Sequence, residues 1–356
     1  MHPLSRRLLP VLQLTRMALA FTAIADSQCG LLLRWARRGE LQNQFLIPPT
    51  SQMLLMILVS VGLYGFGMSL NDIIDRRRDA QIAANRPLPS GRIGLLTAHC
   101  ICTFLALCAI VGGFFYAKMS PRHGDFSFIL VISTGLLIAF YDFAGKYLVG
   151  LGLLSLGFIR FSHSLIASPE LPVLWHPLLL LNHVTILSTV AYVWEEKRPA
   201  LTKGHWWGVF GGIALLNAMA ISVVALRNDG SMARALSLRI GLILPGLAAL
   251  AFIALAYWIF KNTRPRRAAG QKLMLFGLLW LILYDASFAT VYVNWIAGLI
   301  LLSLLPVAYF AVQLMRWWSQ MLMLSQKPQY QRAGASDLPV TKIQFPPPGT
   351  PGGGLG

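Results

Sequence analysis

Long apolar segments separated by short polar ones account for most of this chain. Ten such segments can be traced, and many lack the polar stripe of a soluble amphipathic helix. Their length is close to the roughly 20 residues with which a helix spans a hydrocarbon core. They cover residues 10–33, 51–70, 94–117, 126–141, 148–167, 173–194, 206–226, 237–260, 271–288 and 290–315. Because lipid cannot satisfy exposed backbone groups, the pattern predicts an all-α, polytopic membrane helix bundle.

The ends of the chain qualify this prediction in two ways. The last two segments are only weakly separated, around Asp285 to Asn294, so we expect nine or ten transmembrane helices. The first segment contains Arg16, and no small-residue cleavage pattern follows it, so it is expected to be retained as a helix. We therefore assign residues 1–318 to one transmembrane domain. Residues 319–356 are rich in proline and glycine and are predicted to be a disordered cytoplasmic tail.

Composition agrees with a membrane protein. The chain is 56% hydrophobic and 12% charged, against about 25% charged residues in soluble domains, and its mean hydropathy is +0.62. The net charge of +17 does not indicate a nucleic-acid partner, because lysine and arginine lie in short loops between apolar segments. Loops that carry an excess of lysine and arginine usually face the cytoplasm. We expect an integral protein of the cell (inner) membrane, with its N-terminus and most basic loops cytoplasmic.

The four cysteines do not suggest a metal site or a disulfide framework. They all lie in apolar segments without the paired spacing of zinc ligands, at Cys29, Cys100, Cys102 and Cys108. Small apolar packing residues are the expected role.

Acidic residues are scarce and clustered. The chain has 13 aspartates and glutamates. Asp72, Asp75 and Asp79 follow the second apolar segment, and Glu195 and Glu196 follow the sixth. An even number of segments separates the two groups, so both are expected at the same membrane face, the cytoplasmic face that is rich in lysine and arginine.

The aspartates form a stripe if the second helix continues through them. At 100° per residue, Asn71, Asp72, Asp75 and Asp79 fall within an arc of about 100°. Oxygen ligands of this kind suit Mg²⁺, which usually leaves room for substrate phosphates. Basic residues are interleaved and can hold the remaining phosphate oxygens; they are Arg76, Arg77, Arg78, Arg86 and Arg92. The alternative is a charge-balanced loop that only sets topology, but it does not explain why the carboxylates share a face.

These residues resemble a known family. Asn71-Asp-x-x-Asp75-x-x-x-Asp79, followed by Asn85-Arg-Pro-Leu-Pro-Ser-Gly91, is similar to the first signature of the UbiA superfamily of intramembrane prenyltransferases. A looser similarity covers Tyr141-x-x-x-x-Lys146 and the Gly157-Phe-Ile-Arg160 stretch. The resemblance extends over about residues 10 to 288.

The resemblance implies a UbiA-like helical bundle and an enzyme activity. Members of the family bind an isoprenyl diphosphate through Mg²⁺ and transfer the isoprenyl group to an acceptor, often aromatic. By position, Asp72, Asp75 and Asp79 would be catalytic. The metal would be held by the same aspartates together with Asn71, Glu195 and Glu196. Diphosphate-binding residues would be Arg16, Arg86, Tyr141, Lys146 and Arg160. The expected partners are an isoprenyl diphosphate, a lipophilic acceptor and membrane lipid.

The second acidic motif departs from the family pattern of paired aspartates. Glu195 and Glu196 are adjacent and point about 100° apart on a helix, and Pro199 would end that helix soon afterwards. The alternative for them is an ion pair with Lys197 or Arg198. This departure leaves open a second function, in which the protein binds a lipid diphosphate or assists membrane transport without catalysis. A CDP-alcohol phosphotransferase is disfavoured, since its glycine-containing signature is absent from the sequence.

Several ionisable residues lie inside predicted helices. Arg160 and His163 share a face of the fifth segment, and a charged side chain inside a membrane costs about 3 kcal/mol, so it usually faces a cavity or a partner. The alternative for both is an interhelical hydrogen bond. The same structural role is favoured for a further group of polar residues: Asp26, Asn182, His183 and Asp285.

Overall fold

The structure is a computed structural model that describes residues 3–42, 44, 46–120, 124–170, 173–227 and 240–325. The predicted tail lies mostly outside these residues. Helix α14 continues to Ser325, which is beyond the expected domain end at residue 318. The described residues up to Met315 form one compact unit, and those from Arg316 to Ser325 belong to a second.

The described residues contain helices and no strands, which confirms the predicted fold class. Within the described part of the chain, nine helices are long and apolar enough to cross a membrane, or ten if a bent pair near the N-terminus is counted as one span. The elements are α1 Pro3–Leu14, η1 Met17–Leu19, α2 Ala20–Gln42, α3 Thr50–Ile74, α4 Arg76–Ile82, α5 Leu95–Lys118, α6 Gly124–Phe143, η2 Gly145–Tyr147, α7 Val149–Ile166, α8 Trp175–Trp194, α9 Lys203–Arg227, η3 Ile240–Leu242, α11 Ile243–Asn262, α12 Arg266–Tyr292, α13 Trp295–Leu302 and α14 Leu304–Ser325.

The uncertainty between nine and ten spans arises at the first helix rather than at the last two. Helix α12 ends at Tyr292, and the Asn294 side chain accepts a hydrogen bond from the backbone nitrogen of Ala297 to begin α13. In contrast, the first span is bent by 57° between α1 and α2. The bend occurs at Arg16, whose φ of 45° places it in the left-handed region.

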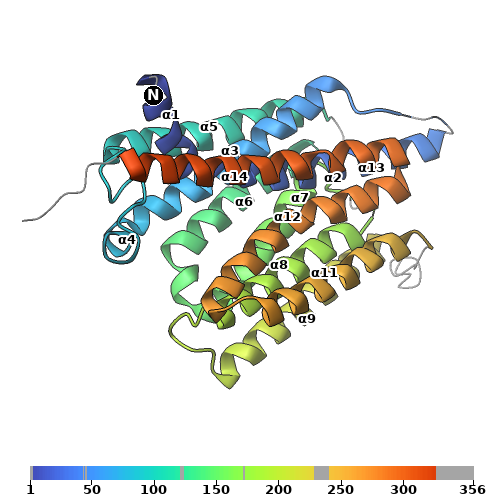
Figure 1. Ribbon diagram of the computed structural model, residues 1–356. Helices are drawn as coiled ribbons and strands as arrows, with labels where there is room; N and C mark the ends of the chain where they lie inside the picture. Colours follow the sequence, from blue (N-terminus) through green and yellow to red (C-terminus); the bar gives the residue numbers. More distant parts are fainter. Residues whose placement is uncertain are drawn as a thin grey trace, which may run out of the picture. The chain divides into compact units, whose positions relative to one another are not determined.

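Glycines allow the central helices to pack closely. Figure 1 shows α3 and α5 running side by side. A Cβ added at Gly62 of α3 would lie 2.7 Å from the carbonyl oxygen of Leu105 and 2.7 Å from the backbone nitrogen of Ala109 on α5. The α3–α5 contact therefore depends on the absence of a side chain at this position.

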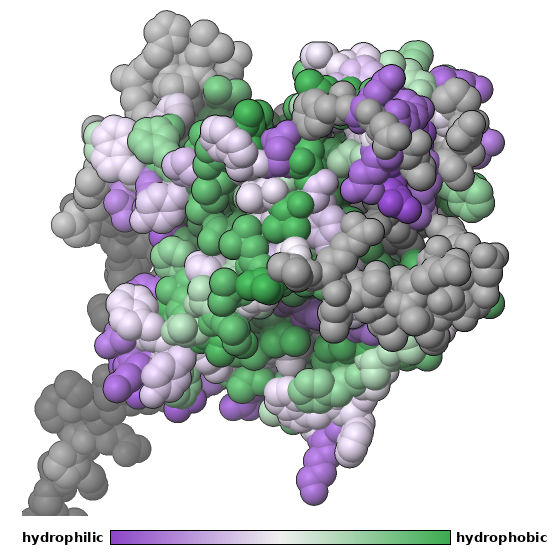
Figure 2. Space-filling view, turned by 90° about the vertical axis from the view of Figure 1, so that its right-hand side faces the viewer, coloured by the Kyte–Doolittle hydropathy of each residue, from purple (hydrophilic) through white to green (hydrophobic). Residues whose placement is uncertain are grey.

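Apolar side chains fill the interior and also cover the outside. One buried cluster joins Leu31, Met56 and Leu63 to Ile138 and Ile166 from the helices around α3. Hydrophobic residues also occupy much of the face seen in Figure 2, and many large apolar side chains are exposed. A soluble protein would rarely expose so much apolar surface, whereas lipid solvates it.

We expect Gly62→Ala to lower the stability of the folded protein by about 1–3 kcal/mol, because the added methyl group meets backbone atoms that cannot move aside. Gly211→Ala is the matched control, since a Cβ there has nothing within 4 Å. Thermal unfolding in detergent measures both variants. Equal melting temperatures for the two variants would contradict the α3–α5 packing.

Candidate functional site

The stripe of oxygen ligands lies at the end of α3. Helical hydrogen bonds continue past the end of α3, from the Asp75 nitrogen to the Asn71 oxygen at 2.9 Å and from the Asp79 nitrogen to the Asp75 oxygen at 2.8 Å. The carboxylates of Asp72 and Asp79 are both 5% exposed. The structure thus brings the predicted stripe residues together in a largely buried position.

Basic residues from outside the stripe contact its aspartates. Arg16 Nη2 lies 3.2 Å from Asp72 Oδ1. Arg86 Nη1 lies 2.5 Å from Asp79 Oδ2 and 3.6 Å from Asp72 Oδ1.

Lys146 completes this set from η2, after the fourth span. Its Nζ is 2.7 Å from Asp75 Oδ1. Tyr141 is close enough to Asp75 and Arg16 for its hydroxyl group to interact with their charges. Together with Arg16 and Arg86, these are four of the five residues that the resemblance assigned to diphosphate binding, and they gather around the stripe.

Asp142 is a member of this group that sequence reasoning missed. It is 2% exposed. With the Asn71 amide oriented to satisfy its neighbours, the amide nitrogen donates to Asp142 Oδ1 at 3.0 Å and to Asp75 Oδ2 at 3.3 Å. A single carboxylate at the end of an apolar segment stands outside the acidic clusters. The available signal was its spacing, since Asp142 lies four residues before Lys146.

The loop between α4 and α5 holds Arg86 in place. The Ser90 hydroxyl donates to the Arg86 carbonyl at 2.6 Å, and Gly91 supplies the positive φ of 70° that turns the chain. Arg92 donates to the Asn85 carbonyl and to Gln13 Oε1 of α1. Partial burial lowers the pKa of the Arg92 guanidinium, which stays charged because an arginine pKa lies far above neutrality.

The first helix is attached to the same loop. Leu14 of α1 packs against Leu88 and Ile93 of the loop in one buried cluster. Arg16 follows directly, at the bend. The break in the first span therefore directs an arginine toward Asp72, and the left-handed backbone at Arg16 is a local strain that this arrangement holds in place.

The second acidic group is at the end of α8. Glu195 Oε2 lies 3.1 Å from Lys197 Nζ, and a Cβ at Gly270 of α12 would meet the Glu195 side chain at 2.7 Å. Glu196 has a φ of 53°. The contact of Glu195 is the ion pair that the sequence left open as an alternative, so the metal role of Glu195 and Glu196 stays a prediction.

The side chain of Arg160 contacts residues of α2 and not those of the stripe. Its Nη1 is 2.5 Å from Asp26 Oδ2, and its Nη2 donates to Thr22 Oγ1 at 2.7 Å. These contacts match the interhelical alternative. The diphosphate-binding role of Arg160 therefore stays a prediction without support from its contacts.

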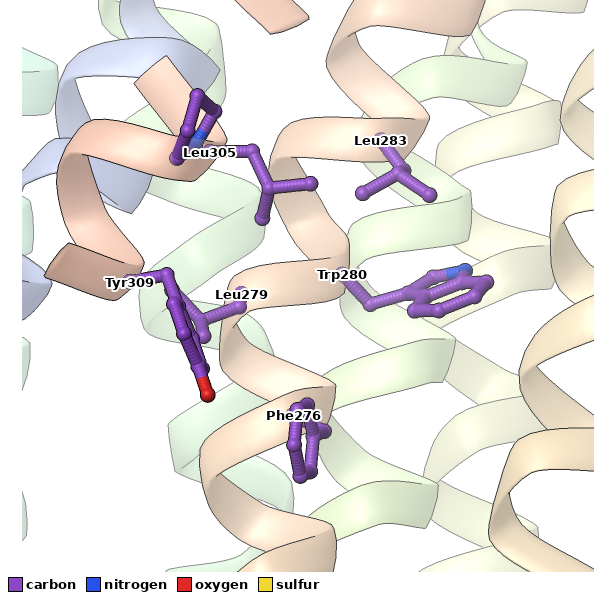
Figure 3. Close-up of a pocket in the computed structure, with 7 residues that line it drawn as sticks. Phe276, Leu279, Trp280, Leu283, Leu305 and Tyr309 are labelled. Carbon is purple, nitrogen blue, oxygen red and sulfur yellow. The ribbon is translucent and has the colours of Figure 1, made fainter. Parts of the chain in front are cut away.

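A separate apolar groove of about 340 Å³ lies between α12 and α14. Figure 3 shows aromatic and aliphatic side chains around it. They are Phe276, Leu279, Trp280, Leu283, Leu305, Pro306 and Tyr309. With no charged side chain in its lining, this groove is unsuited to a diphosphate.

Part of this chain is similar in sequence to a known enzyme. No family model matches the chain. It is 30% identical over 129 residues to the digeranylgeranylglyceryl phosphate synthase of Sulfurisphaera tokodaii, a match that covers 30% of this chain and 46% of the relative. The chain thus spans less than half the length of that curated relative.

Solved structures show the shared fold. A digeranylgeranylglyceryl phosphate synthase superposes with a TM-score of 0.55 at 18% identity, covering 81% of this chain and 99% of that one. A UbiA homologue from Archaeoglobus fulgidus bound to GPP and Mg²⁺ covers 85% of this chain and 99% of its own, at 11% identity and a TM-score of 0.43. At that TM-score the second likeness adds nothing to the fold assignment.

Arg16→Gly is expected to be more stable than Arg16→Ala by about 1 kcal/mol. Both variants lose the contact with Asp72, but only alanine keeps the steric cost of a left-handed backbone. Unfolding of the two purified variants in detergent measures the difference. If Arg16→Ala proves as stable as Arg16→Gly, the backbone at Arg16 is not strained.

Proposed function

We propose that this chain is a member of the UbiA superfamily of intramembrane prenyltransferases, as its similarity to a digeranylgeranylglyceryl phosphate synthase suggests, and that it transfers an isoprenyl group from an isoprenyl diphosphate to a lipophilic acceptor within the membrane. The observation that carries the proposal is the group at the end of α3, where the carboxylates of Asp72, Asp75 and Asp79 meet cations from separate chain segments. A loop that only sets topology needs no such convergence.

The donor set at this site fits Mg²⁺. The oxygens of Asn71, Asp72, Asp75 and Asp79 are hard ligands on one side of the helix, and Asp142 adds a further buried carboxylate. Carboxylates outnumber the cations that contact them, so the site can accept positive charge. When bound, the metal would neutralise the charge that develops on the departing diphosphate.

The basic residues are suited to binding diphosphate oxygens. In the structure Arg16, Arg86 and Lys146 each pair with an aspartate. The Arg16 side chain is 40% exposed and that of Arg86 is 37% exposed, so both can turn toward a ligand at the membrane boundary. We assign them, with Lys146 and Tyr141, to hold the diphosphate by charge-assisted hydrogen bonds while the allylic bond breaks.

The surrounding helices supply the second requirement of the reaction. An allylic cation must be kept from water, and an apolar, membrane-embedded helix bundle excludes water. A lipophilic acceptor reaches the same place from the bilayer. The name of the matched relative, digeranylgeranylglyceryl phosphate synthase, supports a lipid acceptor.

The membrane and the orientation are also proposals. The stripe, the loop with Arg86 and the end of α8 follow spans that end at the side rich in lysine and arginine. We place this side and the N-terminus in the cytoplasm by the positive-inside rule, in the cell (inner) membrane.

Asp72→Ala and Asp75→Ala are each expected to lower Mg²⁺-dependent transfer by at least about 100-fold, since each removes charge at the point where the leaving group must be stabilised. Asp125→Ala, which removes an exposed carboxylate at the start of α6, is the matched control and should keep wild-type activity. The assay follows the release of diphosphate and the transfer of label from geranyl diphosphate in membranes. Full activity of the Asp72/Asp75 double variant would remove the catalytic claim.

The same assay addresses the rival, binding-only function. If donors of several chain lengths bind without release of diphosphate across a range of acceptors, the chain is a binder and not a transferase.

The variants Glu195→Gln and Glu196→Gln test whether these two residues bind the metal. A ligand role predicts that either change raises the Mg²⁺ concentration needed for half-maximal activity, whereas an ion pair with Lys197 predicts no change.

A further inference from the structure

A second group of ionisable side chains lies buried between helices, outside the proposed site. It joins Asp26 of α2, Arg160 of α7, His176 of α8 and Asp285 of α12. Asp26 and Asp285 are both 0% exposed, and His176 is 2% exposed. Charged residues are rarely buried to this degree unless they are paired, so each charge in the group needs an explanation.

The contacts form a chain that is interrupted in the middle. At one end, Arg160 Nη1 lies 2.5 Å from Asp26 Oδ2. At the other end, His176 Nε2 lies 2.6 Å from Asp285 Oδ1. The other oxygen of each carboxyl group, Asp26 Oδ1 and Asp285 Oδ2, is buried and has no hydrogen-bond partner among the described residues.

The two carboxyl groups are also close to one another. Asp26 and Asp285 lie within reach of a direct side-chain hydrogen bond. Two ionised carboxylates in this position would place acceptor oxygens against each other in an apolar interior, where the repulsion is poorly screened. A single proton between them turns the same contact into a hydrogen bond and satisfies both orphaned oxygens.

We propose that Asp285 is protonated and donates a hydrogen bond to the ionised Asp26, so that the two residues form a proton-binding site inside the helix bundle. The chain of donors is then complete. His176 Nε2–H donates to Asp285 Oδ1, Asp285 Oδ2–H donates to Asp26 Oδ1, and Arg160 donates to Asp26 Oδ2. The group is neutral, with one positive and one negative charge and an uncharged imidazole.

Neighbouring groups are consistent with this assignment. His163 of α7 has Nδ1 3.8 Å from Asp26 Oδ2 and Nε2 3.1 Å from the Ser60 hydroxyl of α3. Cys29 of α2 completes the surroundings, since its Sγ donates to the Asp285 backbone oxygen at 3.4 Å.

A metal ion is the competing occupant. Ligand atoms of Cys29, His176 and Asp285 all lie within 4.8 Å of one another. However, the thiol and the imidazole already have hydrogen-bond partners, and a metal would have to replace the 2.6 Å contact between His176 and Asp285. The geometry favours the proton.

The shared proton has a consequence for Arg160. With Asp26 ionised, the guanidinium of Arg160 is neutralised within the bundle and is held against α2. The proton also connects α2 to α8 and α12 through Asp285 and His176. We therefore assign Asp26 and Asp285 to position Arg160 and to join these helices, a role that does not rest on the proposed transferase activity.

Infrared difference spectroscopy of the full-length protein in detergent tests the proposal. The wild type at neutral pH should show the carbonyl stretch of a protonated carboxyl group, shifted in heavy water, and in Asp285→Asn this band should be weaker by one carboxyl group. The exposed Asp125→Asn is the matched control and should leave the band unchanged. A wild-type spectrum without this band, or a band that is equally strong in Asp285→Asn, overturns the proposal.

Thermal unfolding of the same variants provides a second measurement. An asparagine can replace a protonated aspartate, because its amide donates to Asp26 and its oxygen accepts from His176. Asp285→Asn should therefore melt close to the wild type, and Asp285→Ala several degrees lower. If both variants melt equally low, Asp285 is ionised beside a charged His176. If the purified protein contains stoichiometric zinc that is lost in Cys29→Ser, the occupant is a metal. Either result refutes the shared proton.

Discussion

The need to compensate carboxylate charge in apolar surroundings governs the arrangement of this protein. A membrane-spanning bundle offers little water to solvate an ionised aspartate, so every such residue requires a partner. At the end of α3 the partners are Arg16, Arg86 and Lys146. The bend in the first span, the loop after α4 and the turn at η2 each present one of these cations. The local structure around the site follows from this requirement.

The two polar groups of the bundle meet the requirement in different ways. At the stripe, Arg16 and Arg86 are partly exposed and their contacts can be exchanged for those of an incoming ligand, which suits a site that binds and releases a metal and a diphosphate. Asp26 and Asp285, in contrast, are fully buried. A fixed arginine and a proton satisfy them, and such an arrangement suits a permanent connection between helices.

The sequence predicted the helical membrane fold because lipid-length apolar segments have few other structures available to them. It also predicted that the stripe residues share a face, since that depends only on helical geometry. The role of Asp142 was missed because its place beside Asn71 depends on how α3 and α6 pack. The same limit applies to Arg160, whose partner Asp26 is 134 residues away in the chain. Tertiary contacts of this kind are not encoded in local spacing.

The central claim is that the stripe binds a divalent cation together with a diphosphate, and Mn²⁺ titration followed by electron paramagnetic resonance tests it most directly. The account predicts that geranyl diphosphate tightens Mn²⁺ binding to the purified protein, and that the variant Asp75→Asn loses this effect. Mn²⁺ binding that is the same with and without geranyl diphosphate, or that is unchanged in the variant, would contradict the account.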